Sequence, residues 1–400
     1  MNIGLFTDMY FPRISGVVTS AQILEKQLTK LGHKVYIFTT ADPAAPRFES
    51  RVYRLPSVPL FFLKDTHRMA FFYPPRLIYK VKKLKLDVVH TYTEFTLGFF
   101  GKLMSSMFSV PMVHTYHTMY EDYTHYVANG KLLTKDFAKK FSRVFCNRAN
   151  VVIAPSEHTA DYLNKIGVKR PIYTIPTGLE FSTFNPTGYS AAELRRARVE
   201  LGIDPQDKVV AVIGRVAKEK SIDVLINAMQ EVVKSVPNCK LLIVGDGPAK
   251  EDLVRMASEL GILRSVVFAG IKPWSEIGKY YCLSDCFATA STTETQGLTY
   301  IEAMAARLPV VVKKDRPFEK LVRDGETGYI FEHDTEAGGK IIKALTMPKQ
   351  SSRIALNAYT AVQPLSAEVF GLELERVYMG IQRNASANAF STRLKTHLRL

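Results

Sequence analysis

Short apolar runs alternate with longer amphipathic segments along most of the chain. In the first half, the apolar runs are typical of buried strands. We expect strands at Ile3–Thr7, Lys34–Thr39, Asp87–Thr91, Val113–Tyr116, Asn150–Ala154 and Ile172–Ile175. Thr19–Leu31 fits a helix that Gly32 ends. Because the spacing between strands leaves room for crossover helices, the pattern predicts an α/β domain with a parallel sheet.

The same alternation begins again after a stretch without periodicity. Residues Pro176–Ser190 are rich in proline, glycine, serine and threonine, which predicts an interdomain linker. Ser221–Ser235 then fits a helix. A second set of strands is expected at Val209–Gly214, Lys240–Val244, Val266–Ala269, Cys286–Thr289 and Pro309–Val312. Two open sheets joined by a linker are expected to face each other across a cleft, which is a favoured place for a ligand.

The last part of the chain is predicted to be helical. Ala367–Ile381 has apolar residues at helical spacing, and we expect this helix to return toward the N-terminal domain. The final stretch, Ser391–Leu400, is basic with interspersed leucines. It can lie on a membrane, pack back on the protein or fray. The expected division of the chain is therefore 1–180, 181–365 and 366–400.

Composition narrows the class of protein. A chain of 400 residues with 46% apolar residues can form two or three full cores. The start, MNIGLFTDMYF, lacks the features of a signal peptide, and no window of 18 uncharged apolar residues predicts a transmembrane helix. The four cysteines form no disulfide framework, and no further ligands near Cys282 and Cys286 indicate a metal site. Buried free thiols in a reducing cytoplasm are expected.

The positive charge is concentrated in the first half of the chain. Of the formal net charge of +15, +11 belongs to residues 1–190, with 24 Lys and Arg against 13 Asp and Glu. Such a surface attracts nucleic acid or an anionic membrane. The sequence has neither an aromatic and basic RNA signature nor a helix-turn-helix pattern, so we expect no nucleic-acid partner.

The segment Phe61–Asp87 mixes aromatic residues with lysines and arginines. It can dock on an anionic bilayer, with its aromatic side chains inserted and its lysines at the headgroups. Alternatively, Leu77, Ile78, Val81 and Leu84 form the inner face of a crossover helix. Both can hold, because the lysines would then cover the outer face of that helix.

Two acids stand out in the stretch STTETQGLTYIEAMAARLPVVV. Seven residues separate Glu294 from Glu302, Gly297 permits a tight turn between them, and a helix is expected from Tyr300. Loops at the carboxyl edge of such a sheet bind ligands in α/β folds, and a helix N-terminus suits a phosphate. The alternative is structural, since Thr299 and Glu302 also fit a capping box and Glu294 then is a solvated loop acid.

Further candidates follow other strands of the second half. Gly214 ends a strand, and Arg215 and Lys220 frame the loop after it, where two cations can neutralise a diphosphate leaving group. The alternative is ordinary loop solubility. The turn Gly245-Asp246-Gly247-Pro248 permits close approach of its backbone, although a plain structural turn explains it equally well. Gly270 ends the next strand, where it can face a base.

Two loops of the first half carry weaker signals. Gly16 lies just before a predicted helix, so nearby amides can meet a phosphate or a sugar. His117 follows a strand in the stretch HTYHTMYEDY, where it can meet a sugar hydroxyl or donate toward a developing charge. Simple loop chemistry is the alternative for Gly16, and a lone histidine is usually structural.

Taken together, these motifs resemble the family 4 retaining glycosyltransferases. The resemblance covers nearly the whole chain in order, and the pair Glu294/Glu302 with Arg215 and Lys220 is its specific part. It implies the GT-B fold, which consists of two Rossmann-like doubly wound domains facing across a cleft. Within this family, ETQGLTYIEAM and HTYHTMYEDYTHY are similar to the bacterial diacylglycerol glucosyltransferases.

The resemblance implies a role for each matching residue of the second half. Arg215 and Lys220 would hold the donor diphosphate, Glu294 would contact the hydroxyls of the transferred sugar, and Glu302 would bind the ribose hydroxyls. Backbone amides of three consecutive residues would face the sugar and the phosphate, and three further glycines would lie along the nucleotide. The first set is Gly297, Leu298 and Thr299, and the second is Gly214, Gly247 and Gly270.

In the first half, His117 would approach the sugar or the acceptor hydroxyl. Gly16 and Val17 would lie beside the donor phosphates and the acceptor. The chain departs from the family where Ser15-Gly16 replaces a Gly-Gly pair, and where Pro176-Thr177-Gly178 with Glu180 replaces Pro-Asn-Gly-Asp. These departures affect individual contacts rather than the class of reaction.

The resemblance implies a metal-independent hexosyltransferase that retains the anomeric configuration and needs no cofactor. The expected donor is UDP-glucose, and the expected acceptor is diacylglycerol, used in glycolipid synthesis at the inner face of the cell membrane by a peripherally bound cytoplasmic enzyme. Other acceptors stay open, namely phosphatidylinositol, a glycolipid or a polysaccharide. Two other classes of protein also stay open. One is a GT-B enzyme that is not a transferase, such as a nucleotide-sugar epimerase or a phosphorylase, and the other is a non-catalytic sugar-binding module.

Overall fold

The computed structural model describes residues 1–13, 15–46, 48–59, 68–70, 72–121, 134–315 and 320–397, with side chains up to residue 383. The chain divides into two compact units. The first comprises Met1–Gly178 with Ala367–Leu400, and the second comprises Leu179–Ser366. The stretch predicted to be a linker is not irregular throughout, because a short helix α6 (Phe181–Phe184) forms within it.

Seven parallel strands form the sheet of the first unit, in the order β3-β2-β1-β6-β7-β8-β9. They are β1 (Asn2–Phe6), β2 (Lys34–Thr40), β3 (Val52–Leu55), β6 (Val88–Thr91), β7 (Met112–Thr115), β8 (Val151–Ala154) and β9 (Ile172–Thr174). All six predicted strands are present, and β3 was not predicted. A separate antiparallel pair is made by β4 (Val58–Pro59) and β5 (Arg68–Met69).

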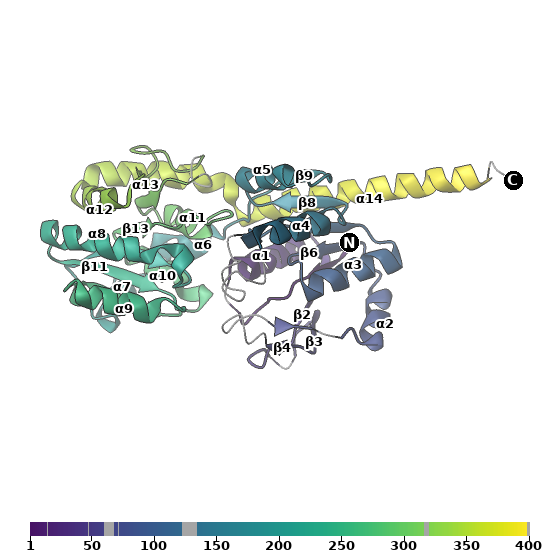
Figure 1. Cartoon of the computed structure of the whole chain (residues 1–400), viewed down its shortest axis with the longest axis horizontal. Coiled ribbons are helices and arrows are strands. Elements are labelled where there is room, and N and C mark those ends of the chain that lie inside the picture. Colours follow the sequence, from purple (N-terminus) through teal and green to yellow (C-terminus); the bar gives the residue numbers. More distant parts are fainter. Residues whose placement is uncertain are drawn as a thin grey trace. The chain divides into compact units, whose positions relative to one another are not determined.

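Helices cover both faces of this sheet. They are α1 (Gly16–Lys30), α2 (Pro75–Leu84), α3 (Thr96–Phe108), α4 (Lys135–Cys146), α5 (Glu157–Lys165) and α14 (Ala367–His397). Successive strand residues point to opposite faces, so Ile3 and Leu5 pack under α1 and α14 while Phe6 packs under α3. Figure 1 shows α14 beside the sheet in yellow. The predicted doubly wound α/β architecture is confirmed for this unit.

The C-terminal helix is longer than predicted. It was expected over Ala367–Ile381, but α14 continues to His397, and its last turns project past the sheet (Figure 1). Phe370, Leu374 and Tyr378 are buried against the first unit. Among the described residues, no helix has both the length and the apolar character that crossing a bilayer requires.

Six parallel strands form the sheet of the second unit, in the order β12-β11-β10-β13-β14-β15. They are β10 (Lys208–Ile213), β11 (Cys239–Val244), β12 (Val266–Gly270), β13 (Cys286–Thr289), β14 (Val310–Lys313) and β15 (Tyr329–Phe331). All five predicted strands are present, and β15 was not predicted. Numbered along the unit, this order is 3-2-1-4-5-6, the Rossmann order.

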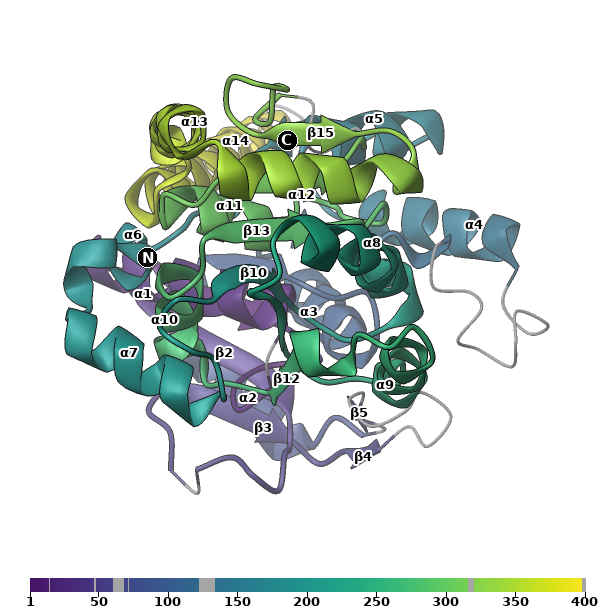
Figure 2. The ribbon, with the colours of Figure 1, turned by 90° about the vertical axis from the view of Figure 1, so that its left-hand side faces the viewer.

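Helices again cover both faces of the sheet. One face carries α8 (Ile222–Ser235), α9 (Lys250–Glu259) and α12 (Ala337–Thr346). The other carries α6, α7 (Ala191–Glu200), α10 (Ile277–Cys282), α11 (Leu298–Ala305) and α13 (Pro348–Val362). Figure 2 shows α8 and α9 on one side of β10 and α7 and α10 on the other.

The cysteines follow their predicted arrangement. All four are free thiols, and Cys146, Cys239 and Cys286 are buried. Cys282 ends α10 and Cys286 begins β13, so the pair straddles a helix-strand junction. Burial raises the pKa of the Cys282 thiol to about 12, which makes it a poor nucleophile at neutral pH.

Candidate active site

The candidate residues of the second unit lie at the carboxyl edge of its sheet. β10 and β13 are neighbours, and the strand order reverses between them. Such a switch point places the loops after both strands side by side, and ligands of open α/β sheets bind there. The loop after β10 carries Arg215 and Lys220, and the loop after β13 carries Glu294. The topology therefore brings together residues that are 74 positions apart.

Lys220 and Glu294 form the closest ion pair of this edge. Lys220 Nζ donates to Glu294 Oε1 at 2.6 Å, and the two side chains are 25% and 18% exposed. Burial raises the pKa of Glu294, but the charge of Lys220 and hydrogen bonds from Lys220 and Ser291 outweigh it, so the net shift is downward. Glu294 is therefore held as a carboxylate at neutral pH.

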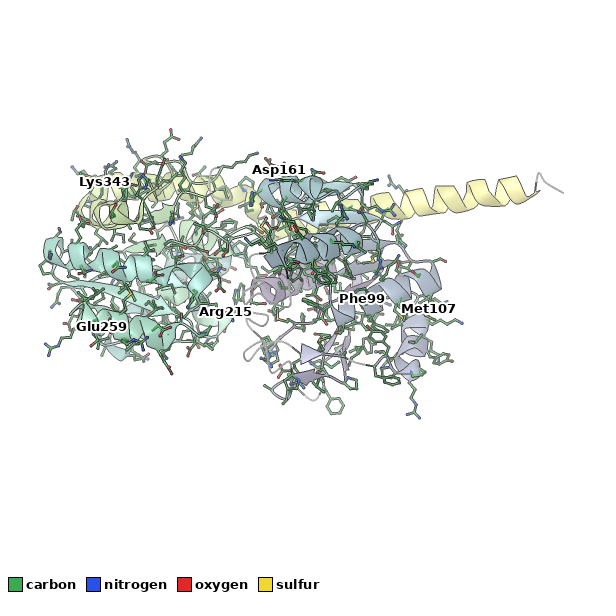
Figure 3. All side chains as sticks on the ribbon, viewed as in Figure 1. Phe99, Met107, Asp161, Arg215, Glu259 and Lys343 are labelled. Atoms are coloured by element: carbon green, nitrogen blue, oxygen red, sulfur yellow. The ribbon has the colours of Figure 1, made fainter. Side chains whose placement is uncertain are left out.

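Arg215 lies beside a different acid from that of Lys220. Its Nη1 lies 3.7 Å from Oε1 of Glu219, whose side chain is buried, while the Arg215 side chain is 39% exposed. Figure 3 labels Arg215 at the edge of the second unit. Thr293 donates to the Glu219 carbonyl at 3.3 Å, which ties the two loops together. The site thus presents two cations, Arg215 and Lys220, at the carboxyl edge of the sheet.

Glycines let the ends of three strands approach one another. The amide of Gly214 donates to the carbonyl oxygen of Val244 at 2.9 Å, and the amide of Gly245 donates to that of Gly270 at 2.9 Å. A Cβ at Gly245 would lie 1.9 Å from the carbonyl oxygen of Gly214, and one at Gly247 would lie 2.3 Å from that of Val216. The absence of side chains at Gly245 and Gly247 therefore permits this close packing of backbone.

Replacing Gly245 by alanine is expected to destabilise the second unit by about 3 kcal/mol or more, because the new Cβ clashes with backbone at a φ of +138°. The measurement is the urea midpoint of unfolding. Gly339→Ala is the matched control, since a Cβ there, within α12, meets nothing within 4 Å and the change should raise the midpoint slightly. Equal midpoints for the two variants would contradict this account of the turn.

The start of α11 excludes the capping box that was one of the two interpretations of its sequence. Gly297, at a φ of +74°, is the N-cap, and no side chain caps the helix. The capping box of Thr299 and Glu302 is therefore wrong, because the helix begins at Leu298 rather than Tyr300. The amides of Leu298 and Thr299 lie in the first turn of α11, where they have no acceptor within the helix. The N-terminus of this helix therefore suits an anion.

Glu302 is turned into the protein instead of back to its own helix. It is 6% exposed, and its Oε2 accepts a hydrogen bond of 2.6 Å from the hydroxyl of Tyr281, on α10. The same hydroxyl lies 3.1 Å from the carbonyl oxygen of Thr299. Burial raises the pKa of Glu302 to about 7, although the hydrogen bond from Tyr281 lowers it. Tyr281 was not singled out in the sequence.

If Glu302 accepts hydrogen bonds from two ribose hydroxyls, it must be ionised to bind. The affinity for UDP-glucose should therefore fall by up to about tenfold per pH unit as pH drops below about 7. Tyr281→Phe removes the interaction that lowers the pKa and should move this decline to higher pH. Calorimetric titration with UDP-glucose between pH 6 and 9 measures both profiles. Affinities that do not change with pH would exclude Glu302 from nucleotide binding.

In the first unit, His117 follows β7 at the carboxyl edge of that sheet. Its ring stacks on Tyr92 with centroids 5.0 Å apart, and its Nε2 is buried without a hydrogen-bond partner among the described residues. Burial, with a smaller contribution from His114, lowers the pKa of His117 to about 3. The imidazole is therefore neutral at physiological pH and keeps one nitrogen available to a ligand.

Gly16 and Val17 form the first turn of α1. The helix starts earlier than the predicted Thr19, and Ser15 is its N-cap, accepting a hydrogen bond from the Val18 amide at 3.3 Å. Gly16 is exposed. These two residues thus present helix amides rather than loop amides, in keeping with the expected contact to an anionic group.

Two buried acids near His117 were missed in the sequence. Asp8 follows β1, accepts a hydrogen bond from the Leu97 amide at 3.0 Å, and so fixes the start of α3. Glu94 follows β6 and contacts His114 at 3.1 Å and the hydroxyl of Tyr120. Both acids lie at the switch point between β1 and β6, and this position is the signal that could have identified them.

Comparison with known proteins identifies relatives along most of the chain. The profile of "Glycosyltransferase Family 4" matches residues 14–182, and that of "Glycosyl transferases group 1" matches residues 195–361. An alpha-monoglucosyldiacylglycerol synthase of Streptococcus pneumoniae is 38% identical over 95% of this chain and 86% of its own. A synthase of the same name from Acholeplasma laidlawii is 36% identical over 95% of this chain and 97% of its own.

Solved structures show the same fold. HepE of Anabaena, crystallised with UDP and glucose, superposes with a TM-score of 0.78 over 95% of this chain and all of its own, at 20% identity. A glycosyltransferase of Rickettsia africae superposes with a TM-score of 0.77 over 96% of this chain and 98% of its own, at 18% identity. At these identities the likeness concerns the fold alone.

Proposed function

Because the chain belongs to the family 4 glycosyltransferases and has their GT-B fold, we propose that it transfers glucose from UDP-glucose to diacylglycerol in glycolipid synthesis. The strongest structural support for a transfer reaction is the Lys220–Glu294 ion pair beside Arg215, at the switch point of the second sheet. The names of the two synthases, which are 38% and 36% identical to this chain, support the lipid acceptor and the glucosyl group.

In this proposal the second unit binds the nucleotide sugar. Arg215 and Lys220 bind the diphosphate, the amides of Leu298 and Thr299 add partial positive charge, and Glu302 binds the ribose. Glu294, kept ionised by Lys220, accepts hydrogen bonds from hydroxyls of the transferred glucose. Gly214, Gly247 and Gly270 line the nucleotide, where the absence of side chains permits close approach.

The first unit is proposed to bind the acceptor. The neutral His117 uses its unpaired Nε2 toward a sugar or acceptor hydroxyl, and Gly16 and Val17 place helix amides beside the phosphates or the acceptor. A hydroxyl oxygen of the acceptor forms a bond to the anomeric carbon while the bond from that carbon to the phosphate oxygen breaks. The acceptor proton passes to the departing phosphate, so attack and departure share one face and the configuration is retained.

The charge that grows on the departing phosphate is the main requirement of this mechanism. Arg215, Lys220 and the start of α11 supply positive charge where it develops, and a catalytic metal is not needed in the scheme. No step requires a second acid or base. We therefore propose a retaining and metal-independent enzyme that uses no cofactor beyond its donor substrate.

We also propose that the enzyme acts on the cytoplasmic side, peripherally bound to an anionic membrane. The inner face of α2 is confirmed, since Leu77, Ile78, Val81 and Leu84 pack against the core of the first unit. Its exposed outer face supports membrane binding and carries Arg76, Tyr79, Lys80, Lys82 and Lys83. Tyr79 is 60% exposed, and the ammonium of Lys83 lies 4.7 Å from its ring centroid. Exposed lysines and an aromatic ring suit the boundary between headgroups and acyl chains. Residues 61–67 and 71 of the predicted membrane segment lie outside the described part.

The test of the proposed function is an acceptor-dependent reaction. The full chain is incubated with separate nucleotide sugars and with diacylglycerol in detergent micelles, and the product is identified by mass and by NMR of its anomeric proton. Formation of α-glucosyl-diacylglycerol from UDP-glucose is the expected result. Conversion of the nucleotide sugar at a rate independent of any lipid would indicate an epimerase or another non-transferase of this fold instead.

A further inference from the structure

The outer face of α3 is apolar, although it lies on the surface. Four large side chains recur at every fourth position and are 38–52% exposed, namely Phe95, Phe99, Leu103 and Met107. Figure 3 labels Phe99 and Met107 along this helix. Lys102 is the only charged residue in the helix sequence TLGFFGKLMSSMF. Because surface helices normally carry charge on their outer side, this face requires a partner that is itself apolar.

Helix α4 continues the same surface. Phe137 is 56% exposed and Val144 is 41% exposed, and between them the ring of Phe141 lies 6.1 Å from that of Phe95. We call the combined surface the apolar stripe, made of Phe95, Phe99, Leu103, Met107, Phe137, Phe141 and Val144. From Phe95 to Met107 it extends about 18 Å, as the rise of a helix over twelve residues gives.

Three cations lie along the edge of this stripe. The guanidinium carbon of Arg148 is 5.9 Å from the ring centroid of Phe99, and Lys102 lies on α3 itself. Arg170 Nε donates to the carbonyl of Asn147 at 2.9 Å, directly before Arg148 in the chain. Burial lowers the pKa of Lys102, and repulsion from both arginines lowers it further. Within the described residues, none of these three cations forms an ion pair with an acid. Such a cluster is stabilised by an external anion.

We propose that the apolar stripe inserts among the acyl chains of an anionic phospholipid bilayer, with Lys102, Arg148 and Arg170 at the lipid phosphates. The inference rests on the proposed lipid acceptor, and it assigns membrane insertion to α3 and α4 in addition to the lysine face of α2. A bilayer matches both parts of the surface, since its hydrocarbon accepts the aromatic and aliphatic side chains and its phosphates lie directly above.

The position of the stripe also fits the reaction. Phe95, at its N-terminal end, packs edge-to-face on Tyr120 with centroids 5.4 Å apart. Tyr120 follows His117 by three residues in the loop after β7. A bilayer in contact with the stripe therefore lies close to the residue proposed to meet the acceptor hydroxyl, so a diacylglycerol can react without leaving the membrane.

A double charge substitution on α3 tests the proposal. Leu103→Glu/Met107→Glu places two carboxylates on the stripe and should lower binding of the full chain to phosphatidylglycerol-phosphatidylcholine vesicles about tenfold or more. The matched control is Met347→Glu/Leu356→Glu in the second unit, where the side chains are 47% and 58% exposed. The control should bind as the unaltered chain does. Equal binding of both double variants would overturn the proposal.

Vesicle binding is measured by co-sedimentation without UDP-glucose, so it is separate from turnover. Binding of UDP-glucose and the urea midpoint of unfolding are measured in parallel and should be unchanged in Leu103→Glu/Met107→Glu, because both side chains are exposed on the first unit and the nucleotide is proposed to bind the second. Loss of vesicle binding with UDP-glucose binding and the urea midpoint retained supports insertion. Retained vesicle binding refutes insertion and leaves the proposed function standing, whereas an unaltered chain without micellar activity refutes the proposed function itself.

A fluorescence measurement tests insertion directly. The chain has a single tryptophan, Trp274 in the second unit, so Phe99→Trp in a Trp274→Phe background gives one reporter on the stripe. Vesicles of lipids brominated on their acyl chains should quench this reporter. The same lipids should leave Leu356→Trp, made in the same background, unquenched. A Phe99→Trp reporter that is bound to vesicles but not quenched would overturn the proposal.

Discussion

Replacing Arg215 by alanine is expected to lower kcat/KM for glucosyl transfer by about 10²–10³. Its guanidinium lies at the carboxyl edge of the second sheet, where the diphosphate is proposed to bind. The negative charge on the departing phosphate is largest in the transition state, so most of the loss should appear in kcat. Arg215→Lys keeps the charge without the bidentate geometry, so its kcat/KM should lie between that of the unaltered chain and that of Arg215→Ala.

Arg255→Ala is the control for this substitution. Arg255 also lies in the second unit and pairs with an acid, Asp252, at 2.5 Å, but it is on the exposed side of α9. Its loss should leave turnover within about twofold of the unaltered chain, since exposed pairs contribute little. The comparison uses initial rates with UDP-glucose and micellar diacylglycerol. Unchanged turnover in Arg215→Ala would remove Arg215 from the mechanism.

Replacing Glu294 by glutamine is expected to reduce kcat by about 10²–10³. The substitution keeps the shape of the side chain but removes the charge that fixes Lys220 at 2.6 Å and that accepts hydrogen bonds from the sugar. Binding of UDP alone should change much less than kcat, because UDP lacks the sugar. Calorimetry with UDP and initial rates with UDP-glucose separate these effects. A variant with normal kcat would show that Glu294 does not contact the transferred glucose.

The partner of this residue gives a prediction about pH. Lys220→Met removes the main interaction that lowers the pKa of Glu294, and burial then raises that pKa. Transfer should therefore decline with falling pH in a range where the unaltered enzyme still has an ionised Glu294. The double variant Lys220→Met/Glu294→Gln should lose much less than the product of the two single losses, because one interaction is removed in both. Independent, multiplicative losses would contradict the coupling.

The apolar periodicity predicted the fold well because buried parallel strands leave continuous apolar runs. Cys286–Thr289 has the predicted bounds, and every other predicted strand is present with small shifts at its ends. The two strands that were not predicted, β3 and β15, each lie at an edge of their sheet. The end of α14 was missed because the alanine, serine and asparagine residues after Ile381 show no apolar residues at helical spacing.

The site was predicted only in part, and the missing part depends on long-range contacts. Gly297, Glu294 and Lys220 belong to local patterns, but the buried partner of Glu302 is Tyr281, which is 21 residues away on another helix. The interaction of Asp8 with the amide of Leu97 joins positions 89 residues apart. Such pairings follow from strand order, which a single sequence does not specify.

The central claim is that the carboxyl edge of the second sheet binds the nucleotide. A crystal structure of the chain with UDP tests it most directly. The account predicts the diphosphate within hydrogen-bond distance of Arg215 or Lys220 and at the start of α11, with the ribose hydroxyls on Glu302. Density for UDP in the first unit, or anywhere away from the ends of β10 and β13, would contradict it.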